Sequence, residues 1–417
     1  MRGPLRRART QTRTQTRGRT RTRGRAARRA STGIAALAVA LAVSLGGAPA
    51  AHAADDPALS GRGPRLYTPD PNPDALSQVA GLVKAGQYRD AAGIAAMVAT
   101  PQAVWFGDQT PAQVEKLTRD VVRDAARADA VPAFALYNVP GRDCANYSAG
   151  GAANTAEYQA WIDAVARGIG RGDAMVVLEP DSLALLPADC GQDDAEGTKT
   201  AARYAEVNYA VDRLEPLPGT RVYLDTGHPG WHAVSSIVPR LIKGGVARAS
   251  GFFTNVSNYN TDDANSWYGK LISSCLAYVD GGGDAAQCPH QSAPRAETQA
   301  WIDAHVHVPP SRMKHFVTDS SRNGQGPWVP PAGKYTDPQD WCNPPGRGLG
   351  ARPTLRTGDP LQDGRLWIKT PGESDGLCLR GTAGPEDPER GTVDPKAGDW
   401  FPQQALELVR LANPPLF

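Results

Sequence analysis

Several familiar sequence signatures are missing from this chain of 417 residues. Its six cysteines include no C-x-x-C pair, the spacing typical of a cysteine metal site. The first expected strand–helix turn has no G-x-G-x-x-G for a dinucleotide phosphate, and no G-x-S-x-G marks a serine nucleophile. After residue 53 every apolar run is shorter than the about 20 residues of a membrane-spanning helix. These absences argue against a dinucleotide-binding sheet, a serine hydrolase and a membrane protein.

The first 53 residues carry charge of one sign only. Residues 1–30 hold twelve arginines and no acidic residue, and the apolar run "GIAALAVALAVSLGG" and the small-residue stretch "APAAHA" follow. This order predicts a secretory signal at 1–53, cleaved after Ala53. An arginine-rich nucleic-acid arm and a twin-arginine signal at Arg28-Arg29 are the alternatives. We therefore expect a secreted, extracellular protein.

Without residues 1–53 the chain has 33 basic and 43 acidic residues, a formal net charge of −10. An acidic protein is a poor partner for nucleic acid. A short polar lead, residues 54–64, precedes the remaining chain, which has no linker rich in Pro, Ser or Thr and no internal repeat. About 360 residues make one large domain or two ordinary ones, and we expect a monomer.

The cysteines also indicate export, since an even number in a secreted chain predicts disulfides. Spacing alone leaves fifteen pairings of six cysteines open. A cysteine metal site is the alternative, and the lack of C-x-x-C disfavours it. The six residues are Cys144, Cys190, Cys275, Cys288, Cys342 and Cys378.

Apolar, β-rich runs alternate with amphipathic stretches along the chain. The stretches at 111–128 and 155–170 repeat apolar residues every three or four positions, which is typical of helices. Seven strand–helix alternations predict a parallel sheet, and at this length a closed or nearly closed α/β barrel rather than an open doubly wound sheet. The runs lie at 103–107, 131–139, 174–180, 221–227, 249–256, 314–319 and 365–371.

Five of these runs have an aspartate near or after their carboxyl end, at 143, 181, 225, 319 and 375. Each alone reads as a helix cap or turn residue. The carboxyl ends of barrel strands meet on one face, where active sites form. Five aspartates at equivalent positions therefore predict a carboxylate cluster that either binds a cation or performs acid–base chemistry.

Glycoside hydrolysis fits this cluster better than a metal site. Metal sites usually recruit histidine as well, and His228, His305 and His307 suit structural or sugar-contacting roles. Cleaving a glycosidic bond needs one carboxyl group as acid and one as base, and a neighbour such as Asp143 together with an apolar wall would raise the pKa of Asp181. Tryptophans near strand ends offer flat surfaces for sugar rings, with core packing favoured for Trp367: Trp105, Trp231, Trp328, Trp341 and Trp367.

Seven ordered motifs resemble those of glycoside hydrolase family 6, the inverting cellulases. They are "LYNVPGRDC", "LEPDSLALL", "YLDTGHPGW", "NVSNY", "DSSRNGQGPW", "WCNPPGRGLG" and "WIKTPGESDG", and the resemblance covers residues 65–417. It implies a distorted seven-stranded parallel (β/α) barrel, similar to a TIM barrel, as one catalytic domain. It also implies hydrolysis of cellulose, a β-1,4-glucan, with no metal and no cofactor.

The resemblance also implies a role for individual residues. Asp181 would be the general acid, Asp143 would raise its pKa and hold the water network, and Asp375 would be the base acting through water. Tyr137 would favour a distorted sugar at the cleavage point. Further expected substrate contacts are Trp105, Trp231, Trp341, Lys369, Glu373, Asp225 and Asn258. Where the family often has a serine that holds the catalytic water, this chain has Ala149, with Ser148 beside it.

The resemblance implies the disulfides Cys144–Cys190 and Cys342–Cys378, which leaves Cys275–Cys288 to close a loop within 265–293. Long segments at 265–293 and 377–400 would form part of a roof over the cleft. The glycine-rich turn after Asp143 is expected to be too short to meet them, so we predict an endo-acting β-1,4-glucanase. A cellobiohydrolase is the close alternative. A glucan-binding protein without catalysis and a cation-stabilised structural protein are alternatives of other classes.

Overall fold

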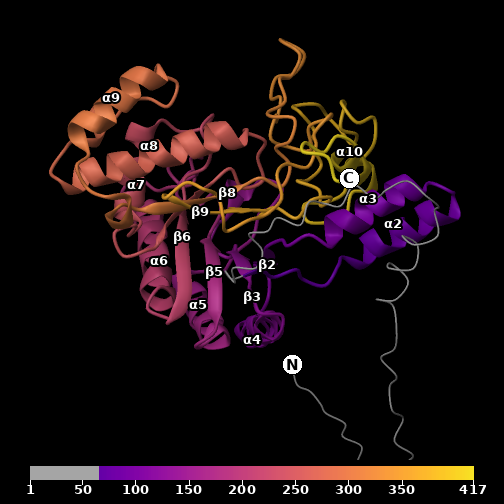
Figure 1. Cartoon of the computed structure of the whole chain (residues 1–417), viewed down its shortest axis with the longest axis horizontal. Coiled ribbons are helices and arrows are strands. Elements are labelled where there is room, and N and C mark those ends of the chain that lie inside the picture. The colour runs from indigo at the N-terminus through magenta and orange to yellow at the C-terminus, as the bar shows by residue number, and fades with distance from the viewer. Residues whose placement is uncertain (1–64) are drawn as a thin grey trace, which may run out of the picture. The chain divides into compact units, whose positions relative to one another are not determined.

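The computed structural model describes residues 65–417. The expected secretory signal at 1–53 and polar lead at 54–64 lie outside these described residues. Figure 1 shows strands and helices alternating along the chain. The helices are α2 (Pro73–Lys84), α3 (Tyr88–Val98), α4 (Pro111–Arg127), α5 (Thr155–Ile169), α6 (Thr198–Leu214), α7 (Val234–Lys243), α8 (Asp262–Asp280), α9 (Arg295–His305) and α10 (Pro402–Arg410), with short 3-10 turns η2 (Asp143–Ala145), η3 (Ala285–Gln287) and η4 (Pro310–Arg312).

The main sheet is parallel, and its strands lie side by side in chain order. Its edge strands nearly meet, because the Ala103 N–H donates to the Trp367 carbonyl at 2.9 Å. The predicted distorted seven-stranded parallel barrel is thus confirmed. Its strands are β2 (Val104–Phe106), β4 (Ala133–Leu136), β5 (Asp173–Leu178), β6 (Gly219–Asp225), β7 (Gly251–Thr254), β8 (His315–Asp319) and β9 (Gln362–Leu366), and β1 (Arg65–Leu66) pairs separately with β3 (Ala130–Val131).

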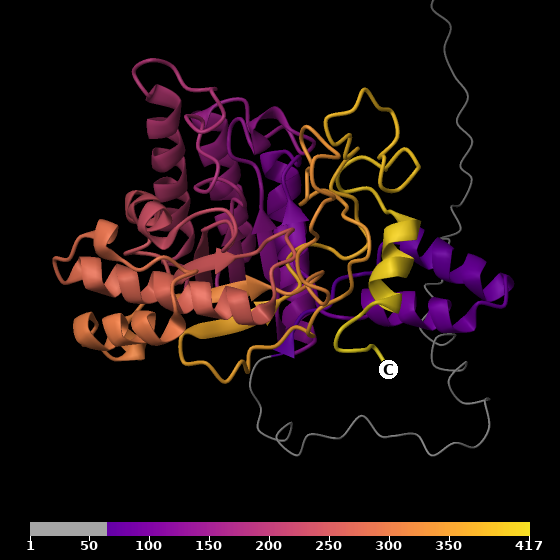
Figure 2. The ribbon, with the colours of Figure 1, turned by 90° about the horizontal axis from the view of Figure 1, so that it is seen from above.

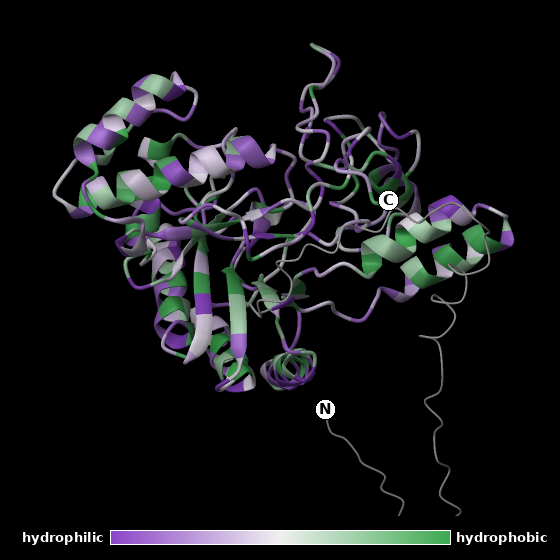
Figure 3. Cartoon of the chain, viewed as in Figure 1, coloured by the Kyte–Doolittle hydropathy of each residue, from purple (hydrophilic) through white to green (hydrophobic). Residues whose placement is uncertain are grey.

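Helix start signals in the sequence explain where the covering helices begin. Thr110 and Gln113 form a reciprocal capping box at the start of α4, and Pro111 occupies its first turn. The Asn154 side chain caps α5 by accepting the Glu157 N–H. Both helices fall where the apolar periodicity predicts them, and Figure 3 shows their apolar residues interspersed with polar ones.

Side chains fill the barrel interior, which leaves room for a site only at its ends. Alternate strand residues point to opposite faces of the sheet. Ala135, Val177 and Tyr223 pack inside the barrel, whereas their neighbours Leu136, Val176 and Leu224 pack against the helices. As in other α/β barrels, the interior is a core and not a pore.

A second core joins the start of the described chain to its end. Helices α2, α3 and α10 lie side by side (Figure 2), and Trp367, Trp400 and Leu408 pack among them. Trp367 is buried, as expected for core packing, but it follows β9 rather than lying inside it. The last strand therefore begins and ends earlier than the predicted run at 365–371.

The segment 265–293 is not the loop that we expected. Most of it belongs to α8, because Leu271, Ile272 and Cys275 recur at helical spacing and are buried. The disulfide Cys275–Cys288 fastens η3 to this helix. Among residues 65–417, no helix combines the length and the apolar character needed to cross a bilayer.

Replacing Cys275 and Cys288 together by serine should lower stability without disturbing the barrel. The disulfide closes a loop with a sequence separation of 13 residues, and the loop-entropy model assigns such a loop about 3 kcal/mol. Urea unfolding of the double variant should show this loss with an unchanged far-UV circular dichroism spectrum. An unchanged unfolding midpoint would contradict the expected contribution of this disulfide.

Candidate active site

The strand-end aspartates approach the barrel mouth from loops of different length. Asp225 and Asp319 are the last residues of β6 and β8. Asp181 follows β5 closely, whereas Asp143 and Asp375 lie farther along the loops after β4 and β9. Parallel strands in chain order bring all of these loops to the same end of the barrel.

A cleft of about 950 Å³ opens at this end. It brings together every residue to which the resemblance assigns a catalytic or substrate-binding role. Those on its walls are Trp105, Tyr137, Asp143, Asp181, Asp225, Trp231, Asn258, Trp341, Lys369, Glu373 and Asp375. Asp319 and Trp328 are not on the walls, and Trp328 instead packs under the guanidinium of Arg380 at 4.9 Å.

Asp181 is held in a state that favours its protonated form. Burial raises the pKa of this carboxyl well above its ordinary value, and the charges of Asp225 and Asp143 add to the effect. The Tyr137 hydroxyl donates to Asp181 Oδ2 at 3.4 Å and opposes it weakly. Asp181 also has a positive φ of 65°, a conformation that costs free energy in a residue other than glycine.

Asp143 lies in η2, where the disulfide Cys144–Cys190 anchors its loop. Its Oδ2 accepts the Ser148 N–H at 2.7 Å. Burial raises its pKa, and this hydrogen bond counteracts part of the increase. Ser148 thus holds Asp143 through its backbone, while Ala149 lies beside it on the cleft wall.

Asp375 is held in the opposite state. Its Oδ2 accepts bonds from Arg322 Nη1 at 2.8 Å, the Asn343 N–H at 3.0 Å and the Tyr259 hydroxyl at 3.3 Å. Lys369 Nζ lies 3.5 Å from Oδ1. Burial alone would raise the pKa of Asp375, but the cations Arg322 and Lys369 outweigh it and the pKa is lowered. Asp375 is therefore ionised.

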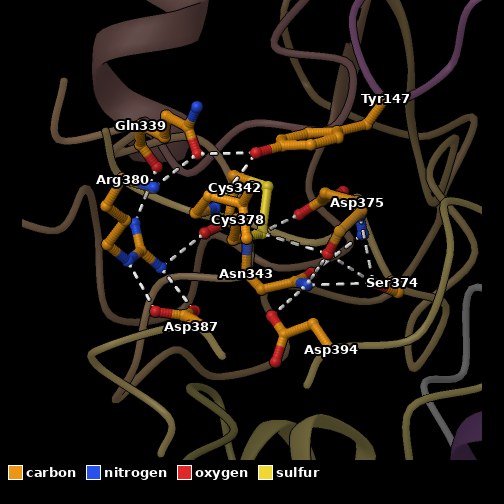
Figure 4. The surroundings of a disulfide bond; sticks show 12 residues. Tyr147, Gln339, Cys342, Asn343, Ser374, Asp375, Cys378, Arg380, Asp387 and Asp394 are labelled. Carbon is orange, nitrogen blue, oxygen red and sulfur yellow. Dashed lines mark hydrogen bonds and ion pairs between the residues drawn. A yellow bond between two sulfur atoms is a disulfide. The ribbon is translucent and has the colours of Figure 1, made fainter. Parts of the chain in front are cut away.

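Asn343 and a disulfide fix the loop that carries Asp375 (Figure 4). The Asn343 side chain accepts the Asp375 N–H at 2.8 Å and donates to Ser374 and Asp394. The disulfide Cys342–Cys378 joins the segment of Asn343, between β8 and β9, to the loop of Asp375 after β9. The six cysteines thus form three disulfides, and two of them fasten loops that bear cleft aspartates.

The remaining two aspartates bind backbone rather than facing the cleft freely. Asp225 accepts the N–H groups of Leu183, Ala184 and Gly227. Asp319 accepts those of Ser257, Ser321, Ile368 and Lys369. Both carboxylates hold neighbouring strand ends together, which is the turn role that a single aspartate suggests.

Two tryptophans give the cleft exposed apolar surfaces. Trp231 is 38% exposed and Trp341 is 36% exposed. Trp105 is held edge-on against Tyr137 with ring centroids 5.6 Å apart, and its indole donates to the Ile368 carbonyl. The polar side chains of Lys369 and Asn258 also line the cleft. Lys369 donates to the Ser374 carbonyl, and Asn258 accepts the Tyr259 N–H. Burial raises the pKa of Glu373, and Lys369 nearby counteracts this.

Comparison with known proteins shows which family this chain belongs to. The family model described as glycosyl hydrolases family 6 matches residues 62–412. The chain belongs to this family. The resemblance seen in the seven motifs is thereby confirmed.

Relatives of this family 6 chain include proteins of both expected types. Endoglucanase A of Cellulomonas fimi is 36% identical over 333 residues, which are 79% of this chain and 58% of that protein. Endoglucanase 1 of Streptomyces halstedii is 34% identical over 367 residues, 87% of this chain and 92% of that protein. A probable 1,4-β-D-glucan cellobiohydrolase C of Aspergillus fumigatus is 35% identical over 306 residues, 67% of this chain and 61% of that protein.

Among solved structures, an endoglucanase from Mycobacterium tuberculosis is 35% identical with a TM-score of 0.64. The match covers 84% of this chain and 97% of that chain. That structure is a complex with methyl-cellobiosyl-4-deoxy-4-thio-β-D-cellobioside. This chain spans less than two thirds of the Cellulomonas and Aspergillus proteins.

Sequence reasoning missed several side chains of this family 6 site. Arg322 is fully buried, stacks on Tyr259 at 4.6 Å and neutralises Asp375. Arg142 binds the carbonyls of Tyr137 and Ser148 and so supports the loop of Asp143. Both arginines lie within the seven motifs, Arg142 directly before Asp143 and Arg322 three residues after Asp319. An arginine close in sequence to a candidate buried carboxylate could therefore have been recognised as a possible ion-pair partner.

The turn after Asp143 contacts the segment 377–400, which we did not expect. The Tyr147 hydroxyl donates to Gln339 Oε1 at 3.2 Å, as Figure 4 shows, and accepts the Leu379 N–H at 3.0 Å. The prediction that this turn cannot meet the segment 377–400 was wrong, because a tyrosine side chain spans the gap. By contrast, no residue of 265–293 lines the cleft.

One acidic cluster among the described residues has the spacing of a metal site. It comprises Cys378, Asp387 and Asp394. Cys378 is in a disulfide, and Asp387 pairs with the buried guanidinium of Arg380 at 2.8 Å. Neither group is therefore free to bind a cation.

His228, for which a structural or sugar-contacting role was expected, lies on the cleft wall. Burial lowers its pKa to about 4.

Exchanging Asp181 or Asp375 for asparagine should change stability in opposite directions. The folded-state pKa of Asp181 is above its unfolded value, so ionisation at pH 7 opposes folding and Asp181→Asn should stabilise the protein. The folded-state pKa of Asp375 is below its unfolded value. Asp375→Asn should therefore cost about 3–5 kcal/mol at pH 7, since Arg322 loses its buried partner.

Urea unfolding at a series of pH values checks both signs. The stability that Asp375 contributes is present above the unfolded pKa of about 3.9 and is lost as pH falls through the lower folded pKa. The Asp375→Asn variant should lack this acid-dependent loss. If the free energy of unfolding changed by the same amount and in the same direction in both variants, Asp181 and Asp375 would not differ in protonation state.

Proposed function

We propose that this chain is a secreted β-1,4-glucanase that hydrolyses cellulose and related β-1,4-glucans with inversion at the anomeric carbon. One observation carries the proposal. A single cleft holds Asp181 with a raised pKa and Asp375 with a lowered pKa. Glycoside hydrolysis needs such a pair, one carboxyl protonated and the other ionised.

The proposed reaction assigns each proton. Asp181 gives its proton to the glycosidic oxygen as the bond from that oxygen to the anomeric carbon breaks. Water attacks the opposite face of the sugar, and its proton passes to Asp375. Because Asp375 Oδ2 already accepts three hydrogen bonds, the proton arrives at Oδ1, through a further water. Because its pKa is lowered, Asp375 stays ionised but is a weak base. We therefore propose that it receives the proton of the attacking water through a second water and does not abstract that proton directly.

The supporting residues fit a glucan chain. Trp231, Trp341 and Trp105 offer aromatic faces, and Lys369, Glu373 and Asn258 offer polar groups, the mixture expected of a ligand cleft. Burial keeps the pKa of Asp181 high, and the charges of Asp225 and Asp143 add to this effect. Three disulfides support secretion. We propose residues 65–417 as the catalytic domain.

We further propose endo action. Trp231 and Trp341 are more than a third exposed, and the segment 265–293 forms a helix away from the cleft. A cellobiohydrolase is the second candidate, and Tyr147 favours it by joining the loop of Asp143 to the segment 377–400. The Cellulomonas and Streptomyces relatives are endoglucanases, and the Aspergillus relative is a probable cellobiohydrolase.

Proton NMR of freshly formed product tests the proposed reaction. Hydrolysis of cellohexaose should release the α-anomer first, because water attacks the face opposite the leaving oxygen. Asp181→Asn is the control, and its turnover should fall by ~10²–10⁴-fold while cello-oligosaccharide binding persists. Initial β-anomer, or near-normal turnover by Asp181→Asn, would refute the roles proposed for Asp181 and Asp375.

Viscometry of carboxymethylcellulose tests the mode of attack. An open cleft admits an internal stretch of chain, so viscosity should fall rapidly for few new reducing ends. Cellobiose as almost the sole early product, with little loss of viscosity, would instead establish the cellobiohydrolase alternative.

A further inference from the structure

Three ionisable side chains lie buried beneath the loops of Asp143 and Asp181 and take no part in the proposed reaction; burial raises the pKa of one of them, Glu179, to about 7. Glu179 is 0% exposed, and Arg203 and Glu206 are each 3% exposed. Burying charge is costly unless the charges are well paired. The ion pair between Arg203 Nε and Glu206 Oε2 is long, at 3.9 Å. Their burial therefore calls for an explanation other than the strength of this pair.

Arg203 extends from α6 to the backbone of both loops. Its Nη2 donates to the Pro140 carbonyl at 2.8 Å, and its Nη1 donates to the Ser182 carbonyl at 3.1 Å. Pro140 shortly precedes Asp143, and Ser182 directly follows Asp181. A single planar guanidinium thus joins the two loops at points next to their carboxyl groups, with a geometry that its fixed fork imposes.

Glu179 makes a second link between the same loops from the opposite direction. It lies directly after β5, two residues before Asp181, with a positive φ of 53°. Its Oε2 accepts the N–H groups of Asn138 at 2.8 Å and Val139 at 2.9 Å, at the start of the loop that leads to Asp143. The strained backbone is consistent with a side chain that must point at this loop.

We propose that Glu179 and Arg203 are positioning residues that clamp the loop of Asp143 against the loop of Asp181. This inference rests on the proposed function, since it concerns how the general acid is held. Glu206 supports the clamp by facing Arg203 and by accepting the Thr155 hydroxyl at 2.6 Å at the start of α5. Neither clamp residue lines the cleft.

Loosening the clamp has a predictable effect on the acid. Asp181 faces Tyr137, Asp143 and Asp225, and its pKa is raised first by burial and then by the two carboxylates. If the loops separate, water reaches Asp181 and Asp143 moves away, so the pKa of Asp181 falls. Activity that depends on protonated Asp181 is then lost at a lower pH on the alkaline side of the pH–rate profile.

Arg203→Lys keeps a positive charge beside Glu206 but cannot reproduce the fork to two carbonyls. Its kcat on cellohexaose should fall on the order of 10²-fold, the cost of a misplacement of about 1 Å, with KM little changed. The alkaline limb should move to lower pH. Arg213→Lys on the same helix is the matched control, because Arg213 is exposed and pairs with Asp163; it should behave as the parent enzyme.

Two further variants separate positioning from folding. Arg203→Met/Glu206→Gln removes both buried charges, and Glu179→Met removes the buried carboxyl that accepts two N–H bonds. Both should fold by circular dichroism and still show the lower kcat and the shifted alkaline limb. Folded variants with the parent kcat and the parent pH profile would overturn the clamp.

A measurement without turnover distinguishes this inference from the proposed function. The Asp181 carboxyl can be titrated by ¹³C NMR in aspartate-labelled protein, with its resonance assigned by its loss in Asp181→Asn. Its pKa should be lower in Arg203→Lys and Glu179→Met than in the parent. An unchanged pKa would overturn the clamp even if the parent hydrolyses glucan. An Asp181 pKa that is lower in these variants than in the parent, together with a parent that is inactive on every β-1,4-glucan, would support the clamp and refute the proposed function.

Discussion

Close packing inside the barrel is the constraint on which the site depends. Ala135, Val177, Tyr223, Phe253 and Val317 fill the space between the strands, so no ligand can enter the barrel axis. The chemistry is confined to loops at one end, where nothing in the regular sheet fixes side-chain positions. The disulfides and the buried hydrogen bonds to backbone groups supply that fixation, and they are concentrated in the loops after β4, β5 and β9.

Carboxylates gathered at one end of a sheet repel one another, and this site resolves the repulsion in three ways. Asp225 and Asp319 are compensated by backbone N–H groups, and Asp375 by Arg322. Asp181 receives only a long bond from Tyr137. Burial and the charges of Asp225 and Asp143 raise the pKa of Asp181, and this one long bond offsets little of the increase.

The sequence predicts the strands and the helices α4 and α5 well because each is encoded locally, whereas a loop was expected where most of α8 lies. Apolar runs place the strands to within a few residues, and apolar periodicity does the same for α4 and α5. The aspartates could be recognised because each follows its run closely or lies in a recognisable motif. Their partners could not, since Arg203 lies in the middle of a helix and its target carbonyls, those of Pro140 and Ser182, carry no sequence pattern. Tyr147 was missed for a related reason, because loop length says little about the reach of a long side chain.

The core formed by α2, α3 and α10 has a consequence for how the protein is made. Asp90 pairs with Arg410, and Gln78 bonds to the Trp400 indole, across more than three hundred residues of chain. Contacts so distant in sequence form late, because a long loop must be closed first. Part of the apolar surface of the first described helices therefore stays uncovered until residues 400–410 have emerged from the ribosome. During synthesis the nascent chain remains incompletely folded, the condition in which a polypeptide can still be threaded through a translocation pore.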